Sequence, residues 1–341
     1  MQIRDVTIDP KLILAPMEGV TDVLFRRLIR QIGGVGLTVT EFIAARALHF
    51  NIKTTKRLAA FDDDEHPIAI QVYGREPQLL AEAAQKVQDL GADIVDLNMG
   101  CPAKKVCRNS GGSSLMKDLR LSQQIVCSMR RVLTVPFTVK MRAGWDHEHR
   151  NAVEMAAMCE EEGVDAVAVH WRTRTDRFGG VRDIGIIAEV KDRLGIPVIA
   201  NGDVVDVRSA LDTLTVTNAD ALMIGRGAVR NPWIFRQIEA ALSGMEMVEV
   251  PMADMERVLL HFLEELIATF ETPKSALGRF KMVAKYFCGN VPGGSELRYK
   301  ILHSQTVTEA RDVTTAFFAS TEAVTSGQPP KPARGSAPAP E

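Results

Sequence analysis

The pair Asn98 and Cys101 is the feature of this sequence that points most clearly to chemistry. Both residues follow the short apolar segment Asp93–Leu97, which predicts a buried parallel strand. Pro102 disfavours helical geometry at the residue before it, so the Cys101 thiol is expected to project from a loop. A thiol with an ordinary pKa of about 8.5 is mostly protonated at neutral pH and can donate a proton. The alternative is a buried, inert cysteine.

Polar side chains also follow most of the other apolar segments. They are Glu41, Gln71, Lys140, Arg142, His170, Asn201 and Arg226, and the first segment is followed by Pro16 and Met17. The carboxyl ends of the strands in a parallel barrel converge on one face, so this set predicts a single active-site cleft. The alternatives are a core role for His170 and surface ion pairs for Arg142 and Arg172.

Two glycine-containing turns follow the last two predicted strands. They comprise Asn201, Gly202 and Asp203, and then Gly225, Arg226 and Gly227. Glycine amides and one guanidinium suit a phosphate monoester, and loops at these barrel positions often bind phosphate. FMN fits better than FAD or NAD, because the dinucleotide fingerprint GxGxxG does not follow the first strand. The alternative is a pair of tight turns with a surface arginine.

Eight strand-then-helix cycles position these residues. The expected strands are Leu12–Ala15, Gly36–Thr40, Ile68–Val72, Asp93–Leu97, Phe137–Lys140, Ala166–His170, Val198–Ala200 and Ala221–Ile224. The expected helices include Val23–Gln31, Gln78–Leu90, Ser113–Val132, Arg150–Glu162, Ile184–Arg193 and Val207–Leu214. This α/β alternation predicts a closed (β/α)₈ TIM barrel, with a doubly wound open sheet as the alternative.

The pattern changes after Leu242. Helical periodicity alone runs from Met252 to about Thr321, which predicts a small C-terminal all-helical domain. The last residues are rich in Pro, Ala, Gly and Ser, which predicts a disordered tail. The expected domains are therefore 1–242, 243–323 and the tail 324–341.

Composition narrows the class of protein. The five cysteines form no CxxC pair, which argues against a disulfide framework or a metal site and for a reducing cytoplasm. The sequence has no apolar run long enough to span a membrane and no secretion-signal pattern at its start. The net charge of −2 means that a nucleic-acid partner would need a local basic surface.

Several motifs together resemble one known family. They are Leu14–Asp22, Gln71–Gly74, Asn98–Val106, Val139–Trp145, His170–Arg174, Ile199–Asp203 and Ala221–Gly227. In this order they resemble the tRNA-dihydrouridine synthases, the bacterial B-type branch in particular, over the chain from about Lys11 to Ala310. Trp171, where the family pattern predicts a small residue, and the segment 178–183 depart from the pattern. Both are expected where tRNA or NADPH approaches.

The resemblance implies that NADPH or NADH reduces bound FMN, which passes hydride to C6 of a D-loop uracil while Cys101 protonates C5. It implies that Lys140 lies beside the pyrimidine edge of the flavin, where a cation stabilises the reduced ring. The cofactor-binding residues that it implies are Pro16, Met17, Glu18, Gln71, Lys140, His170, Asn201, Gly202, Asp203, Gly225 and Arg226.

A tRNA substrate also needs a surface that holds the tRNA body, because its uridine must leave the base stack. Basic residues cluster between Lys274 and Lys300 in the expected helical domain. The substrate-binding residues expected here are Asn98, Arg142, Arg172, Lys281 and Lys285. Recognition of one tRNA by both domains suggests a monomer.

Two other functions compete with this one. An FMN barrel oxidoreductase of a small pyrimidine, such as a dihydroorotate dehydrogenase, explains the barrel, FMN and Cys101 but leaves the helical domain unused. A non-catalytic RNA-binding protein on a retained barrel would not need Cys101, Lys140 and Asn98 together.

Overall fold

The computed structural model describes residues 1–50, 52–108, 111–177 and 179–325. The chain divides into two compact units, Met1–Val248 and a second that begins at Glu249. Among the described residues, no helix is both long and apolar enough to cross a membrane. Residues 326–341, most of the predicted tail, lie outside the described residues.

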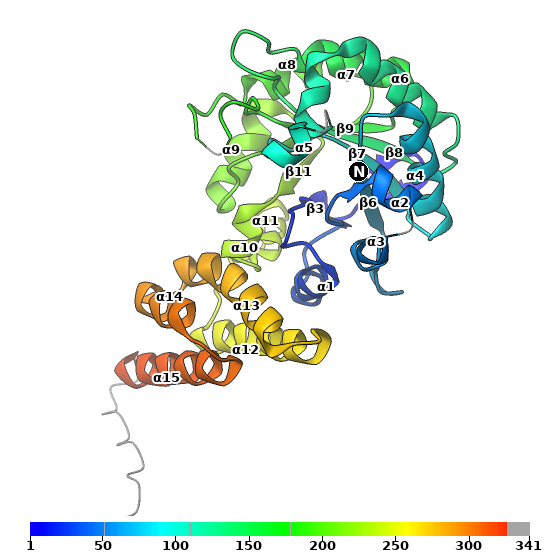
Figure 1. Cartoon of the computed structure of the whole chain (residues 1–341). Coiled ribbons are helices and arrows are strands. Elements are labelled where there is room, and N and C mark those ends of the chain that lie inside the picture. The colour runs from blue at the N-terminus through cyan, green and yellow to red at the C-terminus, as the bar shows by residue number, and fades with distance from the viewer. Residues whose placement is uncertain (51, 109–110, 178, 326–341) are drawn as a thin grey trace, which may run out of the picture. The chain divides into compact units, whose positions relative to one another are not determined.

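The first unit is the predicted (β/α)₈ barrel, which the structure confirms (Figure 1). Within the described residues, eight parallel strands close into a ring, because β4 pairs with both β3 and β6. The barrel strands are β3 (Leu12–Leu14), β4 (Leu37–Val39), β6 (Ile68–Tyr73), β7 (Ile94–Met99), β8 (Phe137–Arg142), β9 (Ala166–His170), β10 (Val198–Asn201) and β11 (Ala221–Ile224). The short strand β5 (Ile43–Ala44) pairs with β6 near its end.

Apolar side chains fill the barrel interior. Ile13, Val39, Ala69 and Ile199 belong to one buried cluster contributed by most of the strands. Small and branched residues suit this position because layers from alternate strands must interdigitate. A hairpin of β1 (Gln2–Ile3) and β2 (Val6–Thr7) adds Ile3 to the cluster, so that the N-terminal segment packs against the barrel core.

Helices surround the barrel strands in Figure 1. They are α1 (Val23–Ile32), α2 (Ala45–His49), α3 (Lys53–Leu58), α4 (Pro77–Asp89), α5 (Lys104–Arg108), α6 (Leu119–Arg130), α7 (Ala152–Glu161), α8 (Gly185–Arg193), α9 (Val207–Thr217), α10 (Arg226–Arg230) and α11 (Ile234–Leu242). The predicted helix Ser113–Val132 is wrong in its first part. A 3₁₀ segment, η1 (Gly112–Lys117), precedes Asp118, whose carboxylate accepts from Leu121 N–H and caps α6.

The second unit is helical in its described part. It contains α12 (Met252–Thr269), α13 (Pro273–Phe287), η2 (Cys288–Asn290), α14 (Gly294–His303) and α15 (Val307–Thr325). Phe280 and Phe287 belong to the buried core of this unit, whereas Tyr286 is 40% exposed. Amphipathic periodicity identified this unit because each helix buries one apolar stripe against its neighbours.

Candidate active site

The Asn98 side chain organises the turn that carries Cys101. Its Oδ1 accepts from the backbone N–H of Gly100 at 3.1 Å and of Cys101 at 2.9 Å, and its Nδ2 donates to Gln71 Oε1 at 2.7 Å. Asn98 is buried at the end of β7, so these bonds are sheltered from water. The amide therefore fixes the direction in which the Cys101 thiol leaves the strand.

The segment after Cys101 folds back over the same turn. The Cys101 carbonyl accepts from the N–H and the Oγ–H of Ser113, at 3.1 and 3.0 Å, and from Cys107 Sγ at 3.6 Å. Gly112 has φ +57°, and a Cβ there would lie 2.8 Å from the Cys101 carbonyl oxygen. Ser113 therefore closes this loop. Residues 109 and 110 of the loop lie outside the described residues.

The surroundings of the Cys101 thiol favour its protonated form. Burial raises its pKa, and the nearby Glu18 carboxylate acts in the same direction. The opposing contributions, a backbone N–H and Arg142, do not reverse the shift. A raised pKa keeps a thiol protonated at neutral pH, which suits an acid better than a nucleophile.

A carboxylate that the sequence analysis did not select lies beneath this turn. Asp96 is buried in β7 and accepts from Gln71 Nε2 at 2.5 Å and from Thr138 Oγ1. Burial raises the pKa of Asp96 to about 6, against the opposing effect of its hydrogen bonds and of Lys140. Asp96 and Asn98 thus hold opposite ends of the Gln71 amide. The signal available in the sequence was an acidic residue inside an apolar segment.

Lys140 and Asn201 meet across the barrel mouth. Lys140 Nζ donates to Asn201 Oδ1 at 2.8 Å, and Asn201 Nδ2 donates to the Met223 carbonyl at 2.7 Å. Burial lowers the pKa of Lys140 to about 8, and neighbouring Arg142 adds to the shift. The register aligns Asn98 with Lys140 on adjacent strands, so the thiol-bearing turn and this cation are neighbours.

The Arg142 side chain forms hydrogen bonds with backbone carbonyls. Its guanidinium donates to the carbonyls of Gly100 at 2.8 Å, Thr173 at 2.7 Å and Arg177 at 3.2 Å. The residue is only 4% exposed, and burial together with Arg172 lowers its pKa to about 10. Arg142 therefore ties the Cys101 turn to the loop after β9, and its surface ion-pair alternative is wrong.

Arg172 is also buried, against the turn that follows β10. Its guanidinium binds both carboxylate oxygens of Asp203, at 2.8 and 2.7 Å, and donates to the Gly179 carbonyl at 2.5 Å. Arg226 Nη2 donates to the same carboxylate at 3.2 Å. Asp203 therefore organises two arginines beside the predicted phosphate turns.

The glycine at position 202 is required by its surroundings. Gly202 has φ +119°, and a Cβ there would lie 2.6 Å from two atoms of the Trp171 ring and 3.0 Å from His170. Trp171 is buried at 2% exposure and packs against this turn. The sequence predicts that Trp171 lies where tRNA or NADPH approaches; in the structure its side chain is buried against the turn after β10.

His170 is a neutral imidazole in this site. Its Nδ1 accepts from Arg172 N–H at 3.1 Å, which leaves the proton on Nε2. Burial holds its pKa well below the usual range, and the cations Arg142 and Lys140 add to the effect. The Nε2–H is therefore a neutral donor.

The loop after β3 completes the barrel mouth. Met17 Sδ lies 3.5 Å from the position that a Cβ would take at Gly225, which brings the loops after β3 and β11 together. Gly19 N–H donates to Glu41 Oε2 at 2.6 Å, and Glu41 is buried. Pro16 is partly buried and Glu18 is exposed. This set faces the same end of the barrel as Cys101.

The other two predicted substrate-binding residues, Lys281 and Lys285, belong to the helical unit. Lys281 Nζ donates to the Ser304 carbonyl at 2.5 Å, which uses its ammonium inside the helical unit. Lys285 is exposed and its Nζ lies 5.8 Å from the ring of Tyr286. In the segment 178–183, Phe178 lies outside the described residues, and Arg182 pairs with Asp212 at 2.6 Å.

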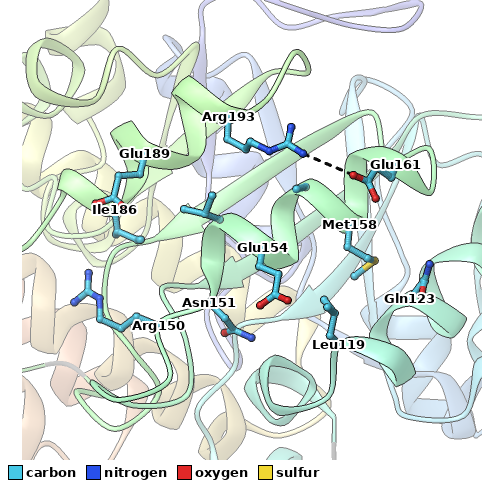
Figure 2. Close-up of a pocket in the computed structure, with 12 residues that line it drawn as sticks. Leu119, Gln123, Arg150, Asn151, Glu154, Met158, Glu161, Ile186, Glu189 and Arg193 are labelled. Atoms are coloured by element: carbon cyan, nitrogen blue, oxygen red, sulfur yellow. Dashed lines mark ion pairs between the residues drawn. The ribbon is translucent and has the colours of Figure 1, made fainter.

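A depression of about 750 Å³ lies elsewhere on the barrel, as Figure 2 shows. Its lining comes from α6, α7 and α8 and includes Glu154, Met158 and Ile186. An ion pair between Arg193 and Glu161, with N and O 3.7 Å apart, crosses one side of it. None of the predicted site residues lines this depression, so we assign it no part in the site.

Removal of the Asn98 amide is expected to loosen the Cys101 turn. In Asn98→Ala, two backbone N–H groups and Gln71 Oε1 lose their partner, so the free energy of unfolding should fall by about 1–3 kcal/mol. Chemical denaturation measures this loss, and alkylation of Cys101 by iodoacetamide should become faster. Asn290→Ala, at an exposed site, is the control. Unchanged stability and alkylation rate would contradict the positioning role of Asn98.

Comparison with known proteins agrees with this geometry. The family model described as dihydrouridine synthase (Dus) matches residues 13–322. The tRNA-dihydrouridine synthase B of Pseudomonas aeruginosa is 39% identical over 299 residues, which cover 87% of this chain and 90% of that protein. The protein of the same name from Xanthomonas axonopodis pv. citri is 38% identical over 331 residues, which cover 97% and 98%. A probable tRNA-dihydrouridine synthase of Rickettsia bellii is 36% identical over 301 residues, which cover 87% and 91%.

Proposed function

This chain belongs to the dihydrouridine synthase family, and we propose that it reduces a uridine in the D-loop of tRNA to dihydrouridine, with FMN as bound flavin and NAD(P)H as reductant. The observation that carries the proposal is the register of β7 and β8, which sets Asn98 beside Lys140. The Cys101 turn, which the Asn98 amide holds, and the Lys140 ammonium therefore lie at the same end of the barrel. This is the end where the chemistry of this fold takes place.

The residues of the mouth fit a flavin with one phosphate. Gly202 has a backbone N–H directly after β10, and Arg226 adds a guanidinium that binds the neighbouring Asp203. We propose that these two residues, with Asn201, Asp203 and Gly225, form the phosphate end of the FMN site.

The ring end of the FMN site would lie nearer to Cys101. We propose that Lys140, Gln71 and His170 contact the flavin ring or its chain, and that Pro16, Met17 and Glu18 cover one edge. Gln71 is held at both ends of its amide, by Asp96 and Asn98, so its orientation is defined before any ligand binds. Such preorganisation is what a site needs to place a ring reproducibly.

When bound, FMN supplies the hydride that reduces C6 of uracil. The Cys101 thiol then donates its proton to C5, where negative charge develops. Asn98 Nδ2 carries two hydrogens, of which one goes to Gln71. We propose that the second donates to a uracil carbonyl and holds the base over the flavin.

The helical unit is proposed to bind the body of the tRNA. Its exposed basic residues include Lys274, Lys285, Arg298 and Lys300. Phosphate contacts of this kind supply most sequence-independent affinity for nucleic acid. We propose that one monomer engages one tRNA in the cytoplasm. Lys281 is expected to act mainly by holding the helices together, through its bond to Ser304.

Charge reversal on the helical unit tests this role. In the double variant Lys285→Glu/Arg298→Glu, the Kd for tRNA should rise about tenfold or more, and the salt dependence of binding should become shallower. The control is Lys11→Glu/Arg131→Glu, which changes the net charge equally at exposed positions before β3 and β8. Equal losses in both double variants would contradict a specific role for the helical unit.

Dihydrouridine mapping tests the function itself. A strain that lacks this gene should lose dihydrouridine at a D-loop position, and the wild-type gene should restore it. If the Cys101→Ala gene does not restore the lost dihydrouridine, the experiment identifies both the target uridine and the acid. Complete modification without the gene, combined with turnover of free orotate by the purified protein, would instead support a small-molecule reductase.

A further inference from the structure

The indole N–H of Trp171 has no acceptor within the described part of the chain. The side chain is 2% exposed, and its Nε1 is buried without a hydrogen-bond partner there. Buried polar groups in native proteins nearly always have a partner, either in the protein or in a bound molecule. The Nε1–H therefore points to a ligand that supplies an acceptor.

The position of the indole identifies which ligand. A Cβ at Gly202 would lie 2.6 Å from both Cδ1 and Nε1 of Trp171, so this edge of the ring rests on the turn after β10. The same turn is the one that we propose for the phosphate of FMN. The unpartnered donor therefore packs against one residue of the proposed anion site, Gly202.

The charges around the indole also favour an anion. The Arg172 guanidinium carbon lies 4.0 Å from the centre of the Trp171 ring, and Arg172 and Arg226 both bind Asp203. Two guanidinium groups therefore lie around this one carboxylate. Stacking on Trp171 restrains Arg172, which in turn restrains Asp203 and Arg226. Trp171 therefore sits in the middle of a group of residues suited to an oxyanion.

We propose that the Trp171 indole N–H donates a hydrogen bond to the phosphate of bound FMN. The inference depends on the proposed FMN site and extends it by one residue. Because the family pattern predicts a small residue at position 171, this donor would distinguish the chain from relatives that follow the pattern. The phosphate, and not the flavin ring, is the part of the cofactor that Trp171 recognises.

The affinity of the FMN-free full-length protein for FMN and for riboflavin tests the proposal. In Trp171→Phe, which keeps an aromatic ring but removes the donor, the Kd for FMN should rise about tenfold, equivalent to about 1.4 kcal/mol. The Kd for riboflavin, which lacks the phosphate, should stay unchanged. Trp145→Phe is the matched control and should alter neither value. Equal weakening of FMN and riboflavin, or no weakening at all, would overturn the proposal.

Indole N–H signals in the wild-type protein give a test that does not depend on how the variant folds. The chain has three tryptophans, and two-dimensional ¹H–¹⁵N spectra report each indole separately. The Trp171 proton should move downfield with FMN and not with riboflavin. A Trp171 signal that responds to both alike, or to neither, would refute the proposal while FMN binding itself stands. Failure of the wild type to bind FMN would instead refute the proposed function.

Discussion

Replacement of Cys101 by alanine is expected to lower the rate of dihydrouridine formation by about a hundredfold or more. The reason is the loss of the proton donor for C5, since the described contacts of the turn come from backbone atoms that alanine retains. FMN content and the rate at which NADPH bleaches the flavin should stay within about twofold of the wild type, because the change affects only the second half of the reaction.

Single-turnover assays separate the two halves of this reaction. Enzyme reduced beforehand is mixed with unmodified tRNA, and flavin reoxidation is followed together with product. Cys127→Ser, a change at a partly exposed thiol on α6, is the control and should match the wild type. If Cys101→Ala formed dihydrouridine at the wild-type rate, Cys101 would not be the acid.

Replacement of Lys140 by methionine is expected to slow flavin reduction by about a hundredfold, the usual size of effect when one preorganised electrostatic contact is lost. In the proposed site the Lys140 ammonium would stabilise negative charge on the pyrimidine edge of a bound flavin, and methionine fills similar space without charge. Its partner Asn201 would also lose a donor. The midpoint potential of the bound flavin should fall, and spectroelectrochemical titration measures that change directly.

The contribution of Lys140 to FMN affinity should depend on pH. The pKa of Lys140 is lowered to about 8 in the cofactor-free protein, so its positive charge is present below that pH and lost above it. Wild-type affinity for FMN should therefore weaken as the pH rises through about 8. The phosphate is already dianionic there, since its second pKa is about 6. Lys140→Met should bind weakly with no change through this range, and a matching inflection in the variant would assign it to another group.

The stability of the wild-type protein should rise with pH over the range in which its affinity for FMN falls. A lysine with an ordinary pKa of about 10.4 in the unfolded chain and a lowered pKa in the fold makes the protein more stable as the pH rises from about 8 to 10. Lys140→Met lacks that lysine and should show no such rise, and the unpartnered Asn201 Oδ1 should offset part of the stability gained near pH 7. A site residue that costs stability yet supports activity is what a functional role predicts.

Local patterns in the sequence are sufficient to predict the barrel and the end of it where the candidate site lies. Each strand is a short apolar segment such as Phe137–Lys140, and each helix has an apolar face, so local periodicity is enough to identify both. Parallel strands then require that the residues after them, Asn98 and His170 among them, meet at one face. The second unit was predicted in the same way, from its helical periodicity alone.

The partners of those residues were decided only by the tertiary structure. Arg142 contacts Gly100, 42 positions away, and Arg172 contacts Asp203, 31 positions away, so no local pattern could show that both guanidinium groups were already occupied. The burial of Trp171 was likewise not predicted, because it depends on the neighbouring strand and turn and not on the residue itself. Periodicity records which face a residue occupies, whereas hydrogen bonds, burial and pKa depend on contacts between distant segments, which exist only once the barrel has closed.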